Sequence, residues 1–145
     1  MSLPPTDTRH LFRPVAEGLV SLLRELPESD WESPTIAGPW RVRDVVAHIV
    51  DLSLRRLSFH RDRMAPPPPT RPINSAQDFV AFINDLNAEW VVAARRLSPR
   101  VLTDLADLAT SGLAAWFEGL PFDAPALFGV SWAGESESAG WFDVG

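Results

Sequence analysis

The sequence contains no cysteine, no lysine and no tyrosine, and it has no long uninterrupted apolar segment. Without cysteine the chain cannot form disulfides, thiolate zinc sites or a cysteine nucleophile, so any thiol chemistry requires a thiol supplied from outside. No stretch approaches the roughly 20 apolar residues that a membrane span requires, and the N-terminal segment lacks the apolar core of a secretion signal. These absences predict a soluble, cytoplasmic protein that does not use a membrane as partner.

Positive charge is also scarce. All 13 basic residues are arginines, and 19 acidic residues bring the net charge to -6. Nucleic acids and anionic membranes attract basic surfaces, and no local run of arginines offsets the negative balance. The composition therefore argues against nucleic acid as the main partner.

The apolar residues that are present recur at intervals of three and four, the spacing of one helix face. A chain of 145 residues is the size of one domain with one core. The pattern predicts a single all-α bundle over residues 1–145, with helices at 13–26, 41–64, 75–97 and 98–119. The residues expected to face the core are Leu11, Phe12, Val15, Leu19, Leu22, Leu23 and Leu26; Val42, Val45, Val46, Ile49, Leu52 and Phe59; Phe79, Phe82, Ile83, Leu86, Trp90, Ala93 and Leu97; and Leu102, Leu105, Leu108, Leu113 and Trp116.

Prolines and serines mark the ends of two of these helices. The run APPPPTRP (65–72) cannot be helical and predicts a stiff, extended connection between helices. Ser75 and Asp78 have the spacing of a capping box. Ser98 before Pro99 matches a cap followed by a first-turn proline.

The start of the helix at 41–64 depends on a different arrangement. Arg41 is a poor cap residue, but Asp44 can accept a hydrogen bond from the N–H of Arg41 and lies favourably in the helix dipole. Trp40 is expected to pack onto Val45 as a hydrophobic staple.

The end of the sequence has the pattern of a helix that has only begun. Ser136 or Ser138 would cap it, and Trp141 would be its first core-facing residue. We therefore expect the last helix of the bundle to be truncated, with at most its first turn within residues 136–145.

Histidine provides the candidate functional residues. His48 lies at the border of an apolar helix face, where it is either a packed residue or a functional one. Asp44 and Asp51, one turn to either side, could orient its ring or could be ordinary solvated acids. His60 is about 18 Å further along the same helix, so both histidines cannot bind one metal ion, and it is interpreted as a packing residue. His10 belongs to no pattern.

Other catalytic patterns are missing. The sequence has no glycine-rich phosphate loop, no H-E-x-x-H and no G-x-S-x-G. The tryptophans are interpreted mainly as core residues, although Trp132 could line the mouth of a pocket.

One stretch resembles a known family. DWESPTIAGPWRVRDVVAHIVD (30–51) combines a tryptophan, a P-T pair, a second tryptophan, V-x-D-V and an A-H-hydrophobic ending. In this combination it resembles the DinB-like superfamily, in particular the N-terminal metal-binding domain of mycothiol-dependent maleylpyruvate isomerases. The stretch around Asn87 and the segment VSWAGESESAGWFDVG (130–145) are similar to the same branch. The resemblance implies a DinB-like four-helix bundle that holds a divalent metal, usually zinc, through three ligands.

By this resemblance His48 is one metal ligand. The other two would be a Glu or His and a His one turn apart on the last helix, and they are not found in this chain, so an in-frame continuation beyond residue 145 is expected to encode them. A metal-bound thiol is deprotonated, so an external thiol such as mycothiol becomes a nucleophile. The resemblance thus implies a metal-dependent, thiol-using transferase or isomerase that acts on a small molecule.

Two alternatives accompany this hypothesis. In the first, the chain is a non-catalytic helical module for oligomerisation or ligand binding, and His48 is a structural remnant. In the second, two chains complete each other's sites in a homodimer.

Overall fold

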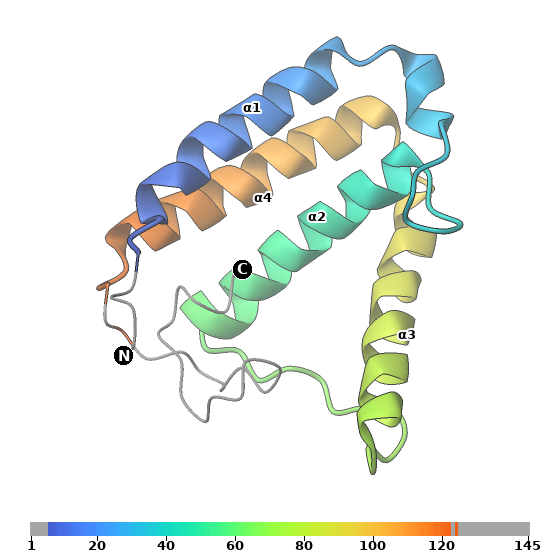
Figure 1. The fold of residues 1–145 in the computed structure, drawn as a ribbon, viewed down its shortest axis with the longest axis vertical. Coiled ribbons are helices and arrows are strands. Elements are labelled where there is room, and N and C mark those ends of the chain that lie inside the picture. The colour runs from blue at the N-terminus through green and yellow to red at the C-terminus, as the bar shows by residue number, and fades with distance from the viewer. Residues whose placement is uncertain (1–5, 123, 125–145) are drawn as a thin grey trace.

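The computed structural model describes residues 6–122 and residue 124. These residues form four α-helices and no extended strand, which confirms the predicted all-α class (Figure 1). The helices are α1 (Phe12–Glu25), α2 (Val42–Arg56), α3 (Ala76–Ala94) and α4 (Pro99–Gly119). The helix predicted to begin within residues 136–145 lies outside the described residues. None of the helices in the described part of the chain is long and apolar enough to cross a membrane.

The helices α1 and α4 lie side by side and run in opposite directions (Figure 1). Two ion pairs join them, Arg13 to Glu118 at 2.6 Å and Arg24 to Asp107 at 2.7 Å. Helix α2 packs on the other side of α4, and α3 packs on α2. Figure 1 shows that α3 meets α2 near the C-terminal end of α3 and diverges from it toward its own N-terminus.

The core is built mainly from small and medium-sized apolar residues contributed by all four helices and by the short 3-10 helix Glu28–Glu32. Its buried members are Leu23, Trp31, Val46, Ala47, Val50, Ala94, Leu102, Ala106 and Ala109. The alanines let the helices approach closely. The approach is tight at Gly112, where an added Cβ would lie 3.2 Å from Cδ1 of Leu57 and the leucine side chain would have to shift slightly.

The orientation of several helices differs from the prediction. Val15 is 70% exposed and Leu108 is 67% exposed, although both were expected to face the core. Others of that set that are exposed are Leu11, Leu22, Leu52 and Phe79. The prediction counted large apolar residues, whereas much of the buried face consists of alanine and of hydroxyl side chains.

The buried hydroxyl groups meet their hydrogen-bonding needs within their own helix. Ser53 donates to the carbonyl of Ile49 at 2.9 Å, and Thr110 donates to the carbonyl of Ala106 at 2.7 Å. A hydroxyl that bonds to the carbonyl four residues earlier presents mainly carbon to its neighbours. These polar residues therefore occupy core positions that a hydrophobic pattern assigns to the surface.

The predicted helix caps are confirmed. The Oγ atom of Ser75 accepts a hydrogen bond from the N–H of Asp78 at 3.1 Å, and the Oγ atom of Ser98 accepts one from the N–H of Val101 at 3.3 Å. Each bond satisfies a backbone donor that the first turn of a helix leaves without a partner.

The start of α2 also follows the prediction, but its end does not. The N–H of Arg41 donates to Oδ2 of Asp44 at 3.0 Å. At its C-terminus α2 continues as one π-helical turn, Leu57–Arg61, and stops before the predicted end near Met64. Arg63 has a φ of 59°, a left-handed conformation that ends a helix.

Candidate functional site

His48 lies on α2 with its imidazole half-buried beside Trp40. The ring centroid of Trp40 lies 5.0 Å from that of His48. The predicted packing of Trp40 onto Val45 stays a prediction. The Nδ1 atom of His48 is buried and has no hydrogen-bond partner among the described residues. Burial lowers the pKa of His48 below its usual 6.5, with a further contribution from the Arg55 charge that Asp51 partly offsets. The imidazole is therefore neutral at pH 7 and has a lone pair to offer.

Asp51 and Arg55 continue the same face of α2, at three and seven residues beyond His48. Nη2 of Arg55 lies 2.6 Å from Oδ2 of Asp51, and it donates to Oδ1 of Asn87 on α3 at 2.7 Å. The contact with Asp51 is a largely buried ion pair between two residues one helical turn apart. We call His48, Asp51, Arg55 and Asn87 the His48 cluster.

The His48 cluster is shielded from water. The side chains of Asp51 and Arg55 are only 12% and 20% exposed. Burial raises the pKa of Asp51, against the opposing effect of Arg55 and His48. Next to the cluster, the indole N–H of Trp90 on α3 donates to the carbonyl of Ala47 on α2 at 2.8 Å. The junction of α2 and α3 thus fixes the cluster from both helices.

Asp44 serves the helix start rather than His48. Its Oδ1 and Oδ2 atoms accept hydrogen bonds from Arg95 at 3.1 and 3.3 Å, in addition to the bond from Arg41. Burial favours a raised pKa for Asp44, but the bonds from Arg95 and Arg41 outweigh it and lower the pKa. Asp44 is therefore not a solvated acid, and of the two acids considered from the sequence it is the Asp51 charge that raises the pKa of His48.

The other histidines lie apart from this cluster. His60 belongs to the π-helical turn, and its ring centroid is 6.4 Å from that of Trp116. This position fits the interpretation of His60 as a packing residue. His10 is exposed. In residues 6–122 and 124, no three His, Cys, Asp or Glu side chains are grouped so that they could hold a metal ion.

The sequence reasoning missed Arg55. Its spacing of four from Asp51 and seven from His48 could have indicated it, since such residues share a helix face. Asn87 entered only through the family resemblance, because its contact with Arg55 depends on how α3 packs against α2.

The comparison with protein families decides the identity of this bundle. The family model of the mycothiol maleylpyruvate isomerase N-terminal domain matches residues 12–144. The chain belongs to this family. No curated protein and no solved structure matches the chain significantly. The match confirms the resemblance found in residues 30–51 and links this maleylpyruvate isomerase-like domain to mycothiol.

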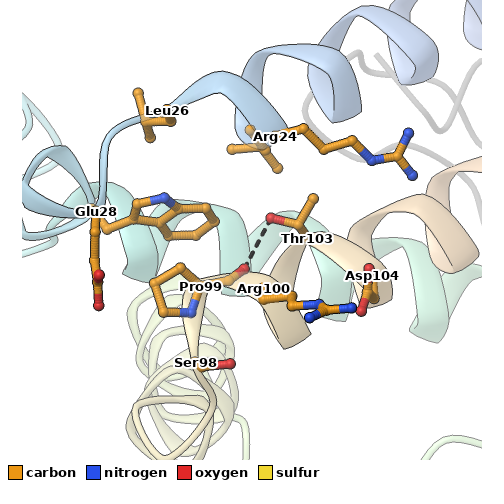
Figure 2. A pocket seen from close by; sticks show the side chains of 10 residues that line it. Arg24, Leu26, Glu28, Ser98, Pro99, Arg100, Thr103 and Asp104 are labelled. Carbon is orange, nitrogen blue, oxygen red and sulfur yellow. Dashed lines mark hydrogen bonds between the residues drawn. The ribbon is translucent and has the colours of Figure 1, made fainter.

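This maleylpyruvate isomerase-like domain also has a cavity away from the His48 cluster (Figure 2). It measures about 540 Å³ and lies between the end of α1, the turn Glu28–Glu32 and the start of α4. Its lining includes Trp31 and the charged residues Arg24, Glu28, Arg100 and Asp104. The volume is within the range of small-molecule sites, but none of the His48 cluster lines the cavity.

The histidine in the π-helical turn predicts a pH dependence of stability. Burial, with the charges of Arg56 and Arg63, lowers the pKa of His60 from 6.5 to about 4. Above pH 6.5 the ring is neutral in both the folded and the unfolded chain, so it has no effect. As the pH falls from 6.5 to about 4, only the unfolded chain gains the proton, and stability is lost. After allowing for solvent screening, we expect the loss from His60 to be about 1–2 kcal/mol.

Urea unfolding at neutral and at mildly acid pH measures this loss. In His60→Leu the free energy of unfolding should fall less between the two conditions than in the wild type. His10→Gln, at an exposed position, should behave as the wild type does. An equal loss in His60→Leu and wild type would show that the imidazole accepts its proton in the folded state.

Proposed function

We propose that this domain binds a divalent metal ion of the zinc type through His48 and uses it to activate an external thiol for isomerisation or transfer on a small molecule. The observation that carries the proposal is the state of His48, which is neutral, half-buried and without a partner at Nδ1 among the described residues, in a chain of a mycothiol-linked family.

The residues present suit a divalent ion in part. Imidazole and carboxylate are donors that zinc accepts, and His48 and Asp51, three residues apart, share one face of α2. A third ligand within the described residues is not grouped with them, so the proposal requires ligands from outside this part of the chain.

The chain's own residues would prepare the site. Trp40 contacts the imidazole with its ring tilted against it, and burial keeps the pKa of His48 low, so that His48 is free of a competing proton. A bound divalent ion would lower the pKa of a thiol that coordinates to it, which makes a nucleophile available at neutral pH. Since the sequence has no cysteine, we propose mycothiol or a similar small thiol as cosubstrate, and a small molecule rather than nucleic acid as partner.

Substitution of His48 tests the metal proposal. We expect His48→Ala to lower the affinity of the full chain for Zn²⁺ or Ni²⁺ by at least about 100-fold, because loss of a ligand costs more than the 10- to 100-fold loss caused by outer-shell changes. Isothermal titration calorimetry measures the affinity, and His10→Ala is the matched control. The proposal would be contradicted if the purified wild type contained no metal and His48→Ala had the same stability as the wild type.

The cavity of Figure 2 favours a second candidate function, the binding of a small polar molecule without catalysis. The charged and hydroxyl groups at its wall would recognise such a ligand, whereas its apolar part would be provided by Trp31 and Leu26. Metal analysis of the purified protein separates the two functions. Stoichiometric metal that depends on His48 favours the first function and its absence favours the second.

A further inference from the structure

Helix α1 has two apolar faces, of which only one belongs to the core. The buried residues of the first face are Ala16, Val20 and Leu23. The second face is exposed and begins one residue before the helix, and its members are Leu11, Val15, Gly18 and Leu22. Its three large side chains are 47%, 70% and 60% exposed, in chain order. We call these four residues the α1 stripe, because spacings of four, three and four place them in one row along a helix.

The α1 stripe lies on the flank of α1 that is turned away from α4. Arg13 and Arg24 form the ion pairs with α4. At about 100° per residue, the stripe lies on the opposite side of the helix from these two arginines. Figure 1 shows α1 at the edge of the bundle, with α4 on one side only. The stripe is therefore a free surface as far as the described residues are concerned.

The glycine in the stripe has no role within the described fold. A glycine in the middle of a helix is unfavourable compared with alanine, because it loses more conformational freedom on folding. A Cβ added at Gly18 would meet nothing within 4 Å among the described residues. No close approach of the described chain thus requires the missing side chain, whereas a second helix packed on the stripe would come closest at this point.

The surface around the stripe lacks charge. Pro14 and Ser21 are the exposed residues that border it on its outer side. None of these six neighbouring positions is charged, although 22% of the whole chain is. A helix face that is turned to water normally carries charged and polar residues, and a contiguous exposed apolar row marks a contact surface. Its partner should then present an equally apolar and uncharged row.

We propose that the α1 stripe is a homodimer interface, in which two copies of the chain pair α1 antiparallel about a two-fold axis. The spacing of four, three and four is the same in both directions along the helix, as a two-fold contact requires. Leu11 then lies opposite the partner's Leu22, and Val15 lies opposite the partner's Gly18. These are the layers of an antiparallel coiled coil, and the glycine leaves space for the valine.

The direction of pairing also follows from charge. Glu25 comes three residues after Leu22 and continues the same row. A parallel pair would place the two copies of Glu25 opposite each other, and like charges at such positions are destabilising. The antiparallel pair keeps them at opposite ends of the contact.

This inference goes beyond the proposed function and does not rest on it. Helix α4 lies between α1 and α2, so a partner on the α1 stripe would contribute no residue to the His48 cluster. It is therefore a different homodimer from the one in which two chains complete each other's sites. Metal binding in His48→Ala and dimerisation through α1 can fail independently of each other.

Sedimentation velocity over a concentration series tests the interface. A contact one helix wide is small, so we expect a dissociation constant on the order of 10 µM. Leu22→Glu should weaken dimerisation at least about 100-fold, because it places an unpaired carboxylate in two layers at once. The matched control is Leu108→Glu, which makes the same change at a position of α4 that is 67% exposed and outside the stripe. It should dimerise as the wild type does, and circular dichroism checks that both variants are folded.

Cross-linking tests the antiparallel register, since the natural sequence has no cysteine to interfere. A thiol reagent that spans less than about 10 Å should join Leu11→Cys chains to Leu22→Cys chains when the two are mixed. Either variant by itself should give little product, because two copies of position 11 would lie about 16 Å apart along the axis.

The outcomes are decisive in both directions. A wild type that stays monomeric over the whole series would overturn the inference and leave the stripe to another occupant. Equal loss of dimer in Leu108→Glu and Leu22→Glu would show that the contact does not depend on α1. Efficient cross-linking of Leu11→Cys to itself would overturn the antiparallel arrangement.

Discussion

Trp31→Ala is expected to lower the free energy of unfolding by about 3–5 kcal/mol, as truncation of a buried tryptophan does. The Trp31 side chain is 2% exposed and is part of the buried cluster to which all four helices contribute. It comes from the short 3-10 helix Glu28–Glu32 between α1 and α2, so the same side chain also fixes the connector to the bundle. A domain of this size has only about 5–15 kcal/mol in total, and the variant should therefore be close to unfolding.

Urea unfolding followed by far-UV circular dichroism measures this effect. The control is Ile36→Ala in the same connector, because Ile36 is fully exposed and its truncation should change stability by less than about 0.5 kcal/mol. Surface substitutions change the free energy of unfolding by less than about 1 kcal/mol. A change of that size in Trp31→Ala would show that the connector is not part of the core.

Asp44→Ala is expected to cost about 3 kcal/mol, the second largest effect. The substitution removes the acceptor of the Arg41 N–H at the start of α2 and the acceptor of two bonds from Arg95. Loss of a cap costs about 1 kcal/mol, and loss of a buried ionic partner adds several kcal/mol. We expect a total loss in the free energy of unfolding of only about 3 kcal/mol, because the half-exposed guanidinium of Arg95 can be hydrated once Asp44 is removed.

The stabilisation by Asp44 should also depend on pH. Its pKa in the folded chain is lower than the usual 3.8, so the contribution is complete above that value and is lost as the pH falls further. Chemical unfolding of Asp44→Ala and of Asp62→Ala provides the comparison, since Asp62 forms only an exposed pair with its neighbour Arg61. Equal stabilities of the two variants would contradict the assigned role of Asp44.

The starts of the helices could be predicted from the sequence because caps are local. Ser75 and Ser98 bond to backbone groups three residues away, and Asp44 bonds back to Arg41 over the same distance. Such contacts are encoded in short spacings and do not depend on how helices pack.

The faces of the helices were harder to predict, because packing decides them. Val15 and Leu108 have the size and spacing of core residues, yet smaller neighbours such as Ala16 and Ala109 occupy the interior. Close packing of helices favours small side chains at the contact, and hydrophobic size alone does not reveal which side that is.

The candidate site shows the same limit. His48 was a candidate because of its position at the border of an apolar helix face, and its partial burial agrees with that position. Its assignment as a metal ligand came from the family resemblance. Arg55 and Asn87 meet only because α3 packs on α2, and no spacing along the chain predicts a contact between residues 32 positions apart. The metal ligand assigned to His48 stays a prediction, as does the single-domain division of residues 1–145.

The attachment of α3 has a consequence for the His48 cluster. The bonds that join α3 to α2 come from Asn87, Trp90 and Arg95, all in the C-terminal half of α3 or directly after it, whereas its N-terminal half diverges from α2 (Figure 1). Asn87 is the first of these anchors along the helix. In terms of thermodynamic linkage, any ligand that favours a different seating of α3 must then also change the free energy of the Arg55 contact, and a change in that contact must in turn bias the seating of α3 by the same amount.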